Sequence, residues 1–217
     1  MNSAWTSVGG AFRFAAGRLE GTLEDTDDGK SLQIVLDKMR IGAIEDLKWR
    51  VEGTEAVGAT APTRDIPYIQ QPYVVAPFIV NSPVGLRLTA FLRATDAGID
   101  VDFRLATVET LSDVSLDLRA EWPVGSFWTA GIDLHSSFPG VSAGVLRLHD
   151  RSVSLMGDVG EQGTFTPNKE GATLRLFNQS LEKGVILVGR FALRPFTDDA
   201  QLQRELDDWL QHPSASL

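Results

Sequence analysis

Aromatic and polar side chains that could bind a ligand gather just after residue 121. The stretch contains Trp122, Phe127 and Trp128, followed by Asp133 and His135. Sugars present flat apolar faces that stack on indole rings, and their hydroxyl groups bond to carboxylates and imidazoles. These five residues therefore predict a carbohydrate-binding surface. The alternative is that Trp122 and one neighbour belong to the core, because Trp122 continues the apolar face of the strand before it.

A second candidate surface lies in a proline-rich segment. Prolines recur there at a fixed interval, at Pro62, Pro67, Pro72 and Pro77. Tyr68 and Tyr73, the only tyrosines of the chain, each follow one of them. Proline favours an extended backbone and lacks an amide donor, so the segment is expected to be an edge strand or a connection across the surface. The two tyrosines are either a second ligand platform or apolar plugs at the rim of the fold.

Residues suited to catalysis are few. His135, His149 and His212 do not have metal-ligand spacing, and the sequence contains no cysteine. We therefore predict no metal site and no cofactor. A glycosidase needs two carboxyl groups about 5 to 10 Å apart. Most carboxylates alternate along expected strands, which is typical of a solvated face, so the better candidates are those in expected loops: Asp150, Asp158, Glu161 and Glu170.

The elements that must position these residues are mostly strands. From 98 to 105 and again from 114 to 122, apolar and polar residues alternate, which is typical of strands with one dry and one solvated face. Two such strands in succession predict an antiparallel sheet, with hairpins at 95–98 and near Leu111. Turn residues separate many further short strands, which favours a β-sandwich. We expect one all-β, antiparallel, supersandwich-like domain over 1–217.

One amphipathic helix is expected near the C-terminal end, at about 198–211. Leu202, Leu206, Trp209 and Leu210 form an apolar stripe at helical spacing. Thr197 or Asp198 can cap its first turn. The helix is expected to pack as a lid over one end of the sheet, docked at an edge, with a partner-binding helix as the alternative.

Composition limits the classes of partner. The net charge is −9, from 20 Lys and Arg against 29 Asp and Glu, and the basic residues are scattered. This argues against nucleic-acid binding, which needs a basic patch or stripe. No apolar run reaches the roughly 20 residues of a membrane helix, and no signal peptide is visible at the start. We therefore expect no membrane association and, by default, a cytoplasmic location.

Two stretches resemble β domains of carbohydrate-active enzymes. Residues 171–180, followed by 184–194, are similar to the closing strands of the C-terminal β domain of family 38 α-mannosidases, in which an R-L-x-N strand precedes a long apolar one. Residues 96–123 resemble a strand pair of the galactose-mutarotase-like fold. The resemblance implies a supersandwich fold. In the mannosidases such a domain is mainly accessory, and the catalytic residues belong to another domain.

This sequence departs from the mutarotase-like pattern at the positions of the catalytic residues. Mutarotase-like epimerases place a catalytic histidine just after the strand that here ends at Trp122, but this chain continues with Pro123, Val124 and Gly125, and the base glutamate has no counterpart. If the resemblance holds, epimerase chemistry is absent.

The sequence thus predicts a non-catalytic carbohydrate-binding or accessory domain. Its ligand contacts are expected at Trp122, Phe127, Trp128, Asp133, His135, Tyr68 and Tyr73. One alternative is a carbohydrate epimerase or lyase of the same fold, with His135 or His149 as acid and a loop carboxylate as base. Another is an assembly protein that binds a protein partner or a second copy of itself through an exposed edge strand.

Overall fold

The computed structural model describes residues 5–16, 18–26, 29–36, 39–51, 54–57, 68–79, 86–121, 127–129, 141–148, 151–158, 164–168 and 171–211, and the structural statements below concern these residues.

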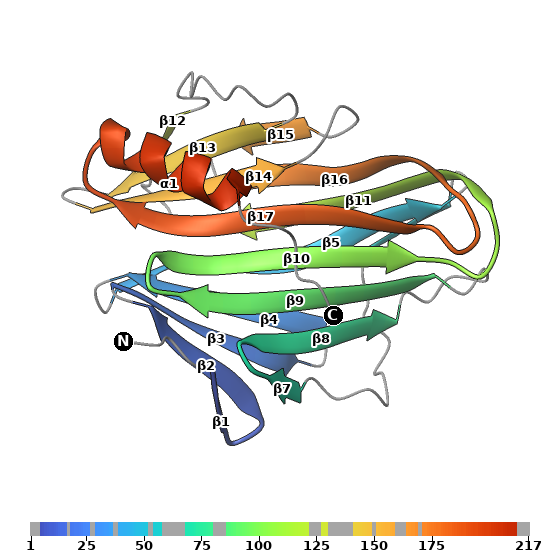
Figure 1. Cartoon of the computed structure of the whole chain (residues 1–217), viewed down its shortest axis with the longest axis horizontal. Coiled ribbons are helices and arrows are strands. Elements are labelled where there is room, and N and C mark those ends of the chain that lie inside the picture. The colour runs from blue at the N-terminus through green and yellow to red at the C-terminus, as the bar shows by residue number, and fades with distance from the viewer. Residues whose placement is uncertain are drawn as a thin grey trace.

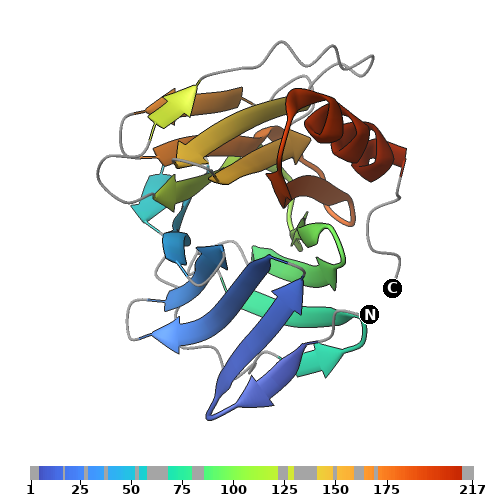
Figure 2. The same cartoon turned by 90° about the vertical axis from the view of Figure 1, so that its left-hand side faces the viewer.

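Two antiparallel sheets lie face to face (Figure 1). The sheet in front, called the helix-bearing sheet, has the order β12 (Phe127–Thr129), β13 (Val141–Leu148), β14 (Arg151–Asp158), β17 (Ile186–Phe196), β10 (Gly98–Ala106), β9 (Arg87–Thr95), β8 (Tyr73–Ile79) and β7 (Tyr68–Gln70). The back sheet has the order β1 (Thr6–Val8), β2 (Ala11–Ala16), β3 (Leu19–Thr26), β4 (Gly29–Leu36), β5 (Met39–Val51), β11 (Leu111–Glu121), β16 (Gly171–Leu181) and β15 (Thr164–Asn168), and β6 (Thr54–Val57) also pairs with β5. The helix α1 (Asp199–Gln211) lies outside both layers (Figure 2). The predicted fold class, antiparallel β with a C-terminal helix, is confirmed.

The core lies between the sheets and follows the period-two pattern. On β10 the apolar positions Ile99, Val101, Phe103 and Leu105 are all buried. Phe103 packs against Phe191 of β17, with ring centroids 5.9 Å apart. Burying each such side chain contributes about 1.5–3 kcal/mol, so the alternation pins the register of every strand that faces this core.

The hairpin predicted near Leu111 is wrong. β10 pairs with β9 and β17, whereas β11 pairs with β5 and β16, so residues 107–110 cross from one sheet to the other. Residues 182–185 make a neighbouring crossing from β16 to β17, and Lys183 N–H donates to Thr110 Oγ1 at 3.4 Å. Alternation of apolar and polar residues shows which face of a strand is buried. It does not show which sheet the strand joins, because strands of both facing sheets bury their apolar face against the same core.

The hairpin predicted at 95–98 is confirmed. β9 and β10 pair from Gly98↔Thr95 onward, and the Gly98 amide donates to Thr95 Oγ1 at 3.1 Å. Gly98 has a φ of 149°, which side chains rarely adopt. The described part of the proline segment lies at a sheet edge, as expected: Tyr68–Gln70 and Tyr73–Ile79 pair as the hairpin β7–β8. Pro62 and Pro67 lie outside the described residues.

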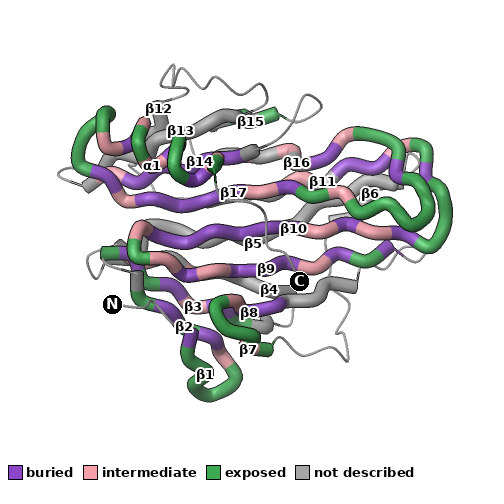
Figure 3. The backbone as a smooth tube through the Cα atoms, viewed as in Figure 1, coloured by how far each residue is buried: buried purple, intermediate pink, exposed green. Residues whose placement is uncertain are grey.

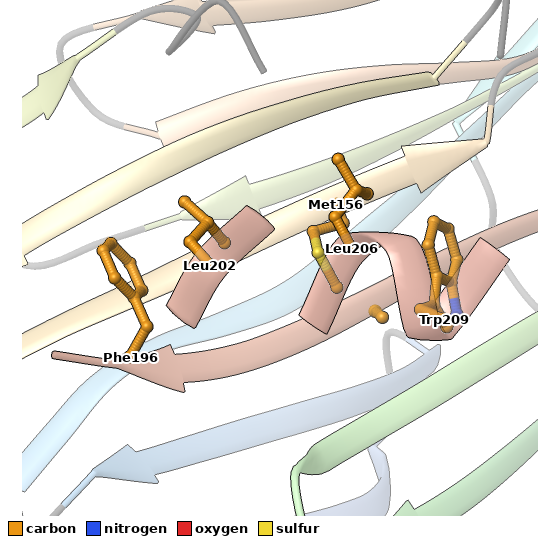
Figure 4. Packing of buried hydrophobic residues seen from close by; sticks show 6 residues of the cluster. Met156, Phe196, Leu202, Leu206 and Trp209 are labelled. Atoms are coloured by element: carbon orange, nitrogen blue, oxygen red, sulfur yellow. The ribbon is translucent and has the colours of Figure 1, made fainter. Parts of the chain in front are cut away.

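The helix α1 packs on the outer face of the helix-bearing sheet, over the interior strands β14 and β17 and not at an edge. Its apolar stripe meets apolar residues of β14 and β17 in one buried cluster (Figure 4): Met156, Ala192, Phe196, Leu202, Leu206 and Trp209. Asp198 is the cap, since its Oδ1 accepts the Gln201 amide at 2.8 Å. The part of β17 under α1 is thus covered on both faces, which explains why its neighbouring residues Ala192 and Leu193 are both apolar and buried.

The solvated face predicted for β10 is wrong. Asp100 and Asp102 are only 4% and 6% exposed. They lie on the outer face of the sheet, where arginines of neighbouring strands and α1 cover them. The alternation located this face correctly, but it could not show that an amphipathic helix from the chain's end would pack beside it.

Candidate functional site

The outer face of the helix-bearing sheet changes in character from one side to the other. Because paired residues of antiparallel strands point to the same side, the register defines rows across the sheet. One row runs through Tyr68, Val75, Phe91, Asp102 and Arg190, and the next through Gln70, Tyr73, Arg93, Asp100 and Ala192. Going across the outer face from β17 to β7, one therefore meets first the apolar residues under α1, then the ion pairs, and then the aromatic side chains.

The aromatic part is built from β7, β8 and β9. Tyr73 meets the Phe91 ring edge-on, with centroids 6.4 Å apart and planes at 87°. Phe91 and Val75 are buried, whereas Tyr68 is 51% exposed. The Arg104 guanidinium lies over Phe91, 4.7 Å from the ring centroid. A ring platform beside guanidinium donors is an amphipathic surface of the kind that binds sugars.

The ion pairs centre on Asp100. Its Oδ2 accepts bonds from Arg93 Nη2 at 2.6 Å and Nε at 3.1 Å, and its Oδ1 accepts a bond from Arg194 Nη2. Arg194 Nη1 also donates to the Ile99 carbonyl oxygen at 3.1 Å. Glu205 of α1 lies 3.9 Å from Arg194 Nε. These contacts fix the strands β9, β10 and β17 and the helix relative to one another.

A second pair joins the sheet to the end of α1. Arg190 Nε lies 3.4 Å from Asp102 Oδ1, and its Nη2 donates to the Trp209 carbonyl oxygen at 3.3 Å. The guanidinium also stacks 4.8 Å from the Trp209 ring centroid. A cation near the last carbonyls of a helix is favoured by the helix dipole. Arg190 therefore anchors the C-terminal end of α1.

Arg93 lies at the border between the ion pairs and the aromatic part. Burial disfavours its charge, but the hydrogen bond and charge of Asp100, with smaller contributions from Tyr73 and Asp102, outweigh it and raise the pKa of the guanidinium. Asp100 and Asp102 have side chains only 6% and 9% exposed and are bound to arginines. Their burial and pairing suit a structural role better than acid–base chemistry.

The predicted site residues fall on separate parts of the structure. Trp122, Asp133 and His135 lie outside the described residues. Phe127 and Trp128 belong to β12, where they pair with Arg147 and Leu146 of β13. Tyr68 and Tyr73 belong to β7 and β8, so the sheet order places the two predicted platforms at opposite edges. The structure brings Tyr73 together with Phe91 and Arg104, pairs Tyr68 with Val75 of β8, and leaves the strand of Trp128 at the opposite edge.

The carboxylates and histidines considered for catalysis are mostly not described. His149, His212, Asp150, Glu161 and Glu170 lie outside the described residues. Asp158 ends β14, opposite Arg190. Among the residues that the structure describes, no group of three or more His, Asp or Glu could hold a metal ion, and no helix is long and apolar enough to cross a membrane.

Sequence reasoning missed Phe91, Arg93, Arg104 and Arg190. Arg104 occupies the face of β10 that alternation assigned to solvent, and the register places the other three on the same outer face of the sheet. The sequence of β17 held a signal, because adjacent apolar residues such as Ala192 and Leu193 are typical of a strand covered on both faces. That signal indicates that another element, here α1, packs on the outer face of β17.

No family model matches the sequence, and no curated protein matches it. Several solved structures share its fold, including the following two. A protein described as a putative kojibiose phosphorylase from the human microbiome superposes with a TM-score of 0.50 at 9% identity, covering 94% of this chain and 30% of that chain. The α-N-acetylgalactosaminidase NagBb from Bifidobacterium bifidum, in a GalNAc complex, gives 0.54 at 10% identity, covering 91% of this chain and 38% of that one.

The chain thus spans about a third of each of these proteins, 30% and 38% of their lengths. At such identities the likeness shows the fold alone. The expected similarity to β domains of carbohydrate-active enzymes is confirmed for the fold, while no sequence family accompanies it.

Proposed function

We propose that this chain is a non-catalytic carbohydrate-binding or accessory β-sandwich domain. The observation that carries the proposal is the aromatic surface of β7, β8 and β9, where Tyr68 is half-exposed, Tyr73 meets the ring of Phe91, and Arg104 lies over that ring. The proteins that share its fold are named for action on carbohydrates, and this chain corresponds to only part of each. That is the relation an accessory domain has to a larger carbohydrate-active protein.

Binding would use the chemistry of this surface. The C–H face of a pyranose ring would stack on Tyr68, and the Tyr73 hydroxyl and the Arg93 guanidinium would bond to sugar hydroxyls. Because Phe91 and Val75 are buried beneath the tyrosines, the platform is held in place before the ligand arrives. A preorganised surface loses little side-chain entropy on binding. The stretch 122–135 stays a second predicted contact region, and its described part, β12, lies at the other edge of the sheet.

The test is a glycan-array screen on the purified chain, followed by titration calorimetry with the best ligand. Tyr68→Ala should weaken binding about tenfold or more, as loss of an aromatic anchor does, and leave the melting temperature unchanged. Val8→Ala is a matched control, because Val8 is similarly exposed, 52% against 51%, but lies on β1 of the back sheet. Trp128→Ala tests the second region separately.

Each outcome decides something. No bound glycan, or a glycan bound equally well by the Tyr68 and Trp128 variants, would overturn the proposal as stated. Turnover of a sugar with a bell-shaped pH–rate profile would replace it with the enzyme alternative, in which His135 or His149 acts as the acid.

A further inference from the structure

The outer face of the helix-bearing sheet continues beyond the aromatic platform, where the described side chains include arginines and no carboxylate. Two rows follow the register away from α1: Thr89, Arg104 and Val188, then Arg87, Ala106 and Ile186. Neither row contains an acidic residue. Val188 and Ile186 are 43% and 55% exposed, so α1 does not cover this part of β17 (Figure 3). We call these two rows the arginine region.

The charges of the arginine region are not compensated as those near α1 are. Arg93, Arg190 and Arg194 all bond to Asp100 or Asp102. Within the described part of the chain, by contrast, neither Arg87 nor Arg104 forms an ion pair with a carboxylate. The Nε atom of Arg104 is buried and has no hydrogen-bond partner. A protein with a net charge of −9 thus presents two uncompensated arginines on one exposed face.

The spacing of these arginines suits one extended ligand. Arg104 pairs with Thr89, and Arg87 lies two residues from Thr89 on the same strand. Such diagonal neighbours have Cβ atoms roughly 7 Å apart, so their guanidinium groups can reach the same anion or adjacent ones. Arg104 also stacks on Phe91, which contacts Tyr73. The arginine region is therefore continuous with the aromatic platform.

We infer that this face binds an anionic saccharide, one that carries carboxylate or sulfate groups, and this inference rests on the proposed function. Tyr68 would stack on a sugar ring while Arg87 and Arg104 bind its acidic groups. A guanidinium offers paired N–H donors that match the oxygens of carboxylate and sulfate. A sugar fits better than an acidic protein because the charges adjoin aromatic rings on an extended sheet face, where a chain of flat rings can lie.

The experiment measures binding of the chain to four polymers: polygalacturonate, heparin, neutral dextran and poly-L-glutamate. We expect binding to polygalacturonate or heparin that weakens as salt rises, with no binding to dextran or polyglutamate. The double variant Arg87→Gln, Arg104→Gln should lose about tenfold or more in affinity, since each lost guanidinium removes a charge-assisted bond. Arg13→Gln is the matched control, because Arg13 is an exposed arginine on β2 of the back sheet.

The outcomes separate this inference from the proposed function. Binding to neutral glycans that the double variant does not affect would overturn the anionic ligand and leave the carbohydrate-binding domain standing. Equal binding of polyglutamate would indicate an acidic protein partner instead. No binding to any polymer or array glycan would overturn both. If the double variant has a lowered melting temperature, Arg87→Gln alone decides, since Arg87 is exposed and its replacement should still cost several-fold.

Discussion

Replacing Asp100 by asparagine removes the charge that holds two arginines of neighbouring strands. Asp100 is bound by Arg194 and Arg93, whose side chains are 5% and 26% exposed. Removing one partner of a buried ion pair costs about 3–5 kcal/mol, because the remaining charge stays away from water. Solvent screens Arg93 and reduces its share of this cost, whereas the buried Arg194 is screened little.

We expect Asp100→Asn to lower the free energy of unfolding by about 3 kcal/mol. The value is at the lower end of the range because Arg194 keeps its bonds to the carbonyl oxygens of Ile99 and Leu193, at 3.1 and 3.2 Å. For a chain of this length, that corresponds to a fall in melting temperature of about 6–12 °C.

Urea unfolding followed by circular dichroism measures the change. The matched control is Asp117→Asn on the back sheet. Asp117 binds Arg175 through two bonds of 2.7 and 2.8 Å, but the two side chains are 21% and 38% exposed. An exposed pair contributes about 1 kcal/mol or less. If Asp100→Asn costs no more than Asp117→Asn, burial does not decide the strength of these pairs and the reasoning fails.

Three further predictions concern the helix and the turns. Asp198→Ala should lower the melting temperature at neutral pH. The Gln201 amide lowers the pKa of Asp198, so its contribution is present above the unfolded pKa and disappears as pH falls through the folded one. A difference in melting temperature that does not shrink as the pH is lowered would contradict this. Leu206→Ala should lower the free energy of unfolding in urea by about 2–5 kcal/mol, since Leu206 lies on the face of α1 that packs against the sheet and is 1% exposed. A decrease of less than about 1 kcal/mol would contradict this packing. Gly98→Ala should destabilise more than Gly184→Ala, because an added Cβ at Gly98 would overlap a backbone carbonyl oxygen, whereas at Gly184 it meets nothing within 4 Å; equal melting temperatures would count against it.

The local elements could largely be predicted because each depends on residues close in sequence. Alternation of apolar residues located β10, and the turn residues before Gly98 located its hairpin with β9. The stripe of Leu202, Leu206 and Trp209 located α1. The proline spacing located the edge hairpin that carries Tyr68 and Tyr73.

The candidate site could be predicted only in part. Tyr68 and Tyr73 were identified as a platform because aromatic residues follow prolines, a pattern visible in the sequence. Phe91 and Arg104 could not be assigned to it, since they come from β9 and β10 and meet the tyrosines only through the register of three strands. The contact region at 122–135 stays a prediction.

The sequence by itself determined which residues of each strand face the core, because burial of apolar side chains imposes a period of two on any strand. Tertiary structure decided which sheet each strand joins, since a strand in either sheet buries its apolar face against the same core. It also decided that Asp100 and Asp102 are buried, because their surroundings are arginines from other strands and a helix near the C-terminal end of the chain. Such contacts depend on which strands and helices the chain topology places side by side, and the alternation of apolar and polar residues within one strand contains no information about that.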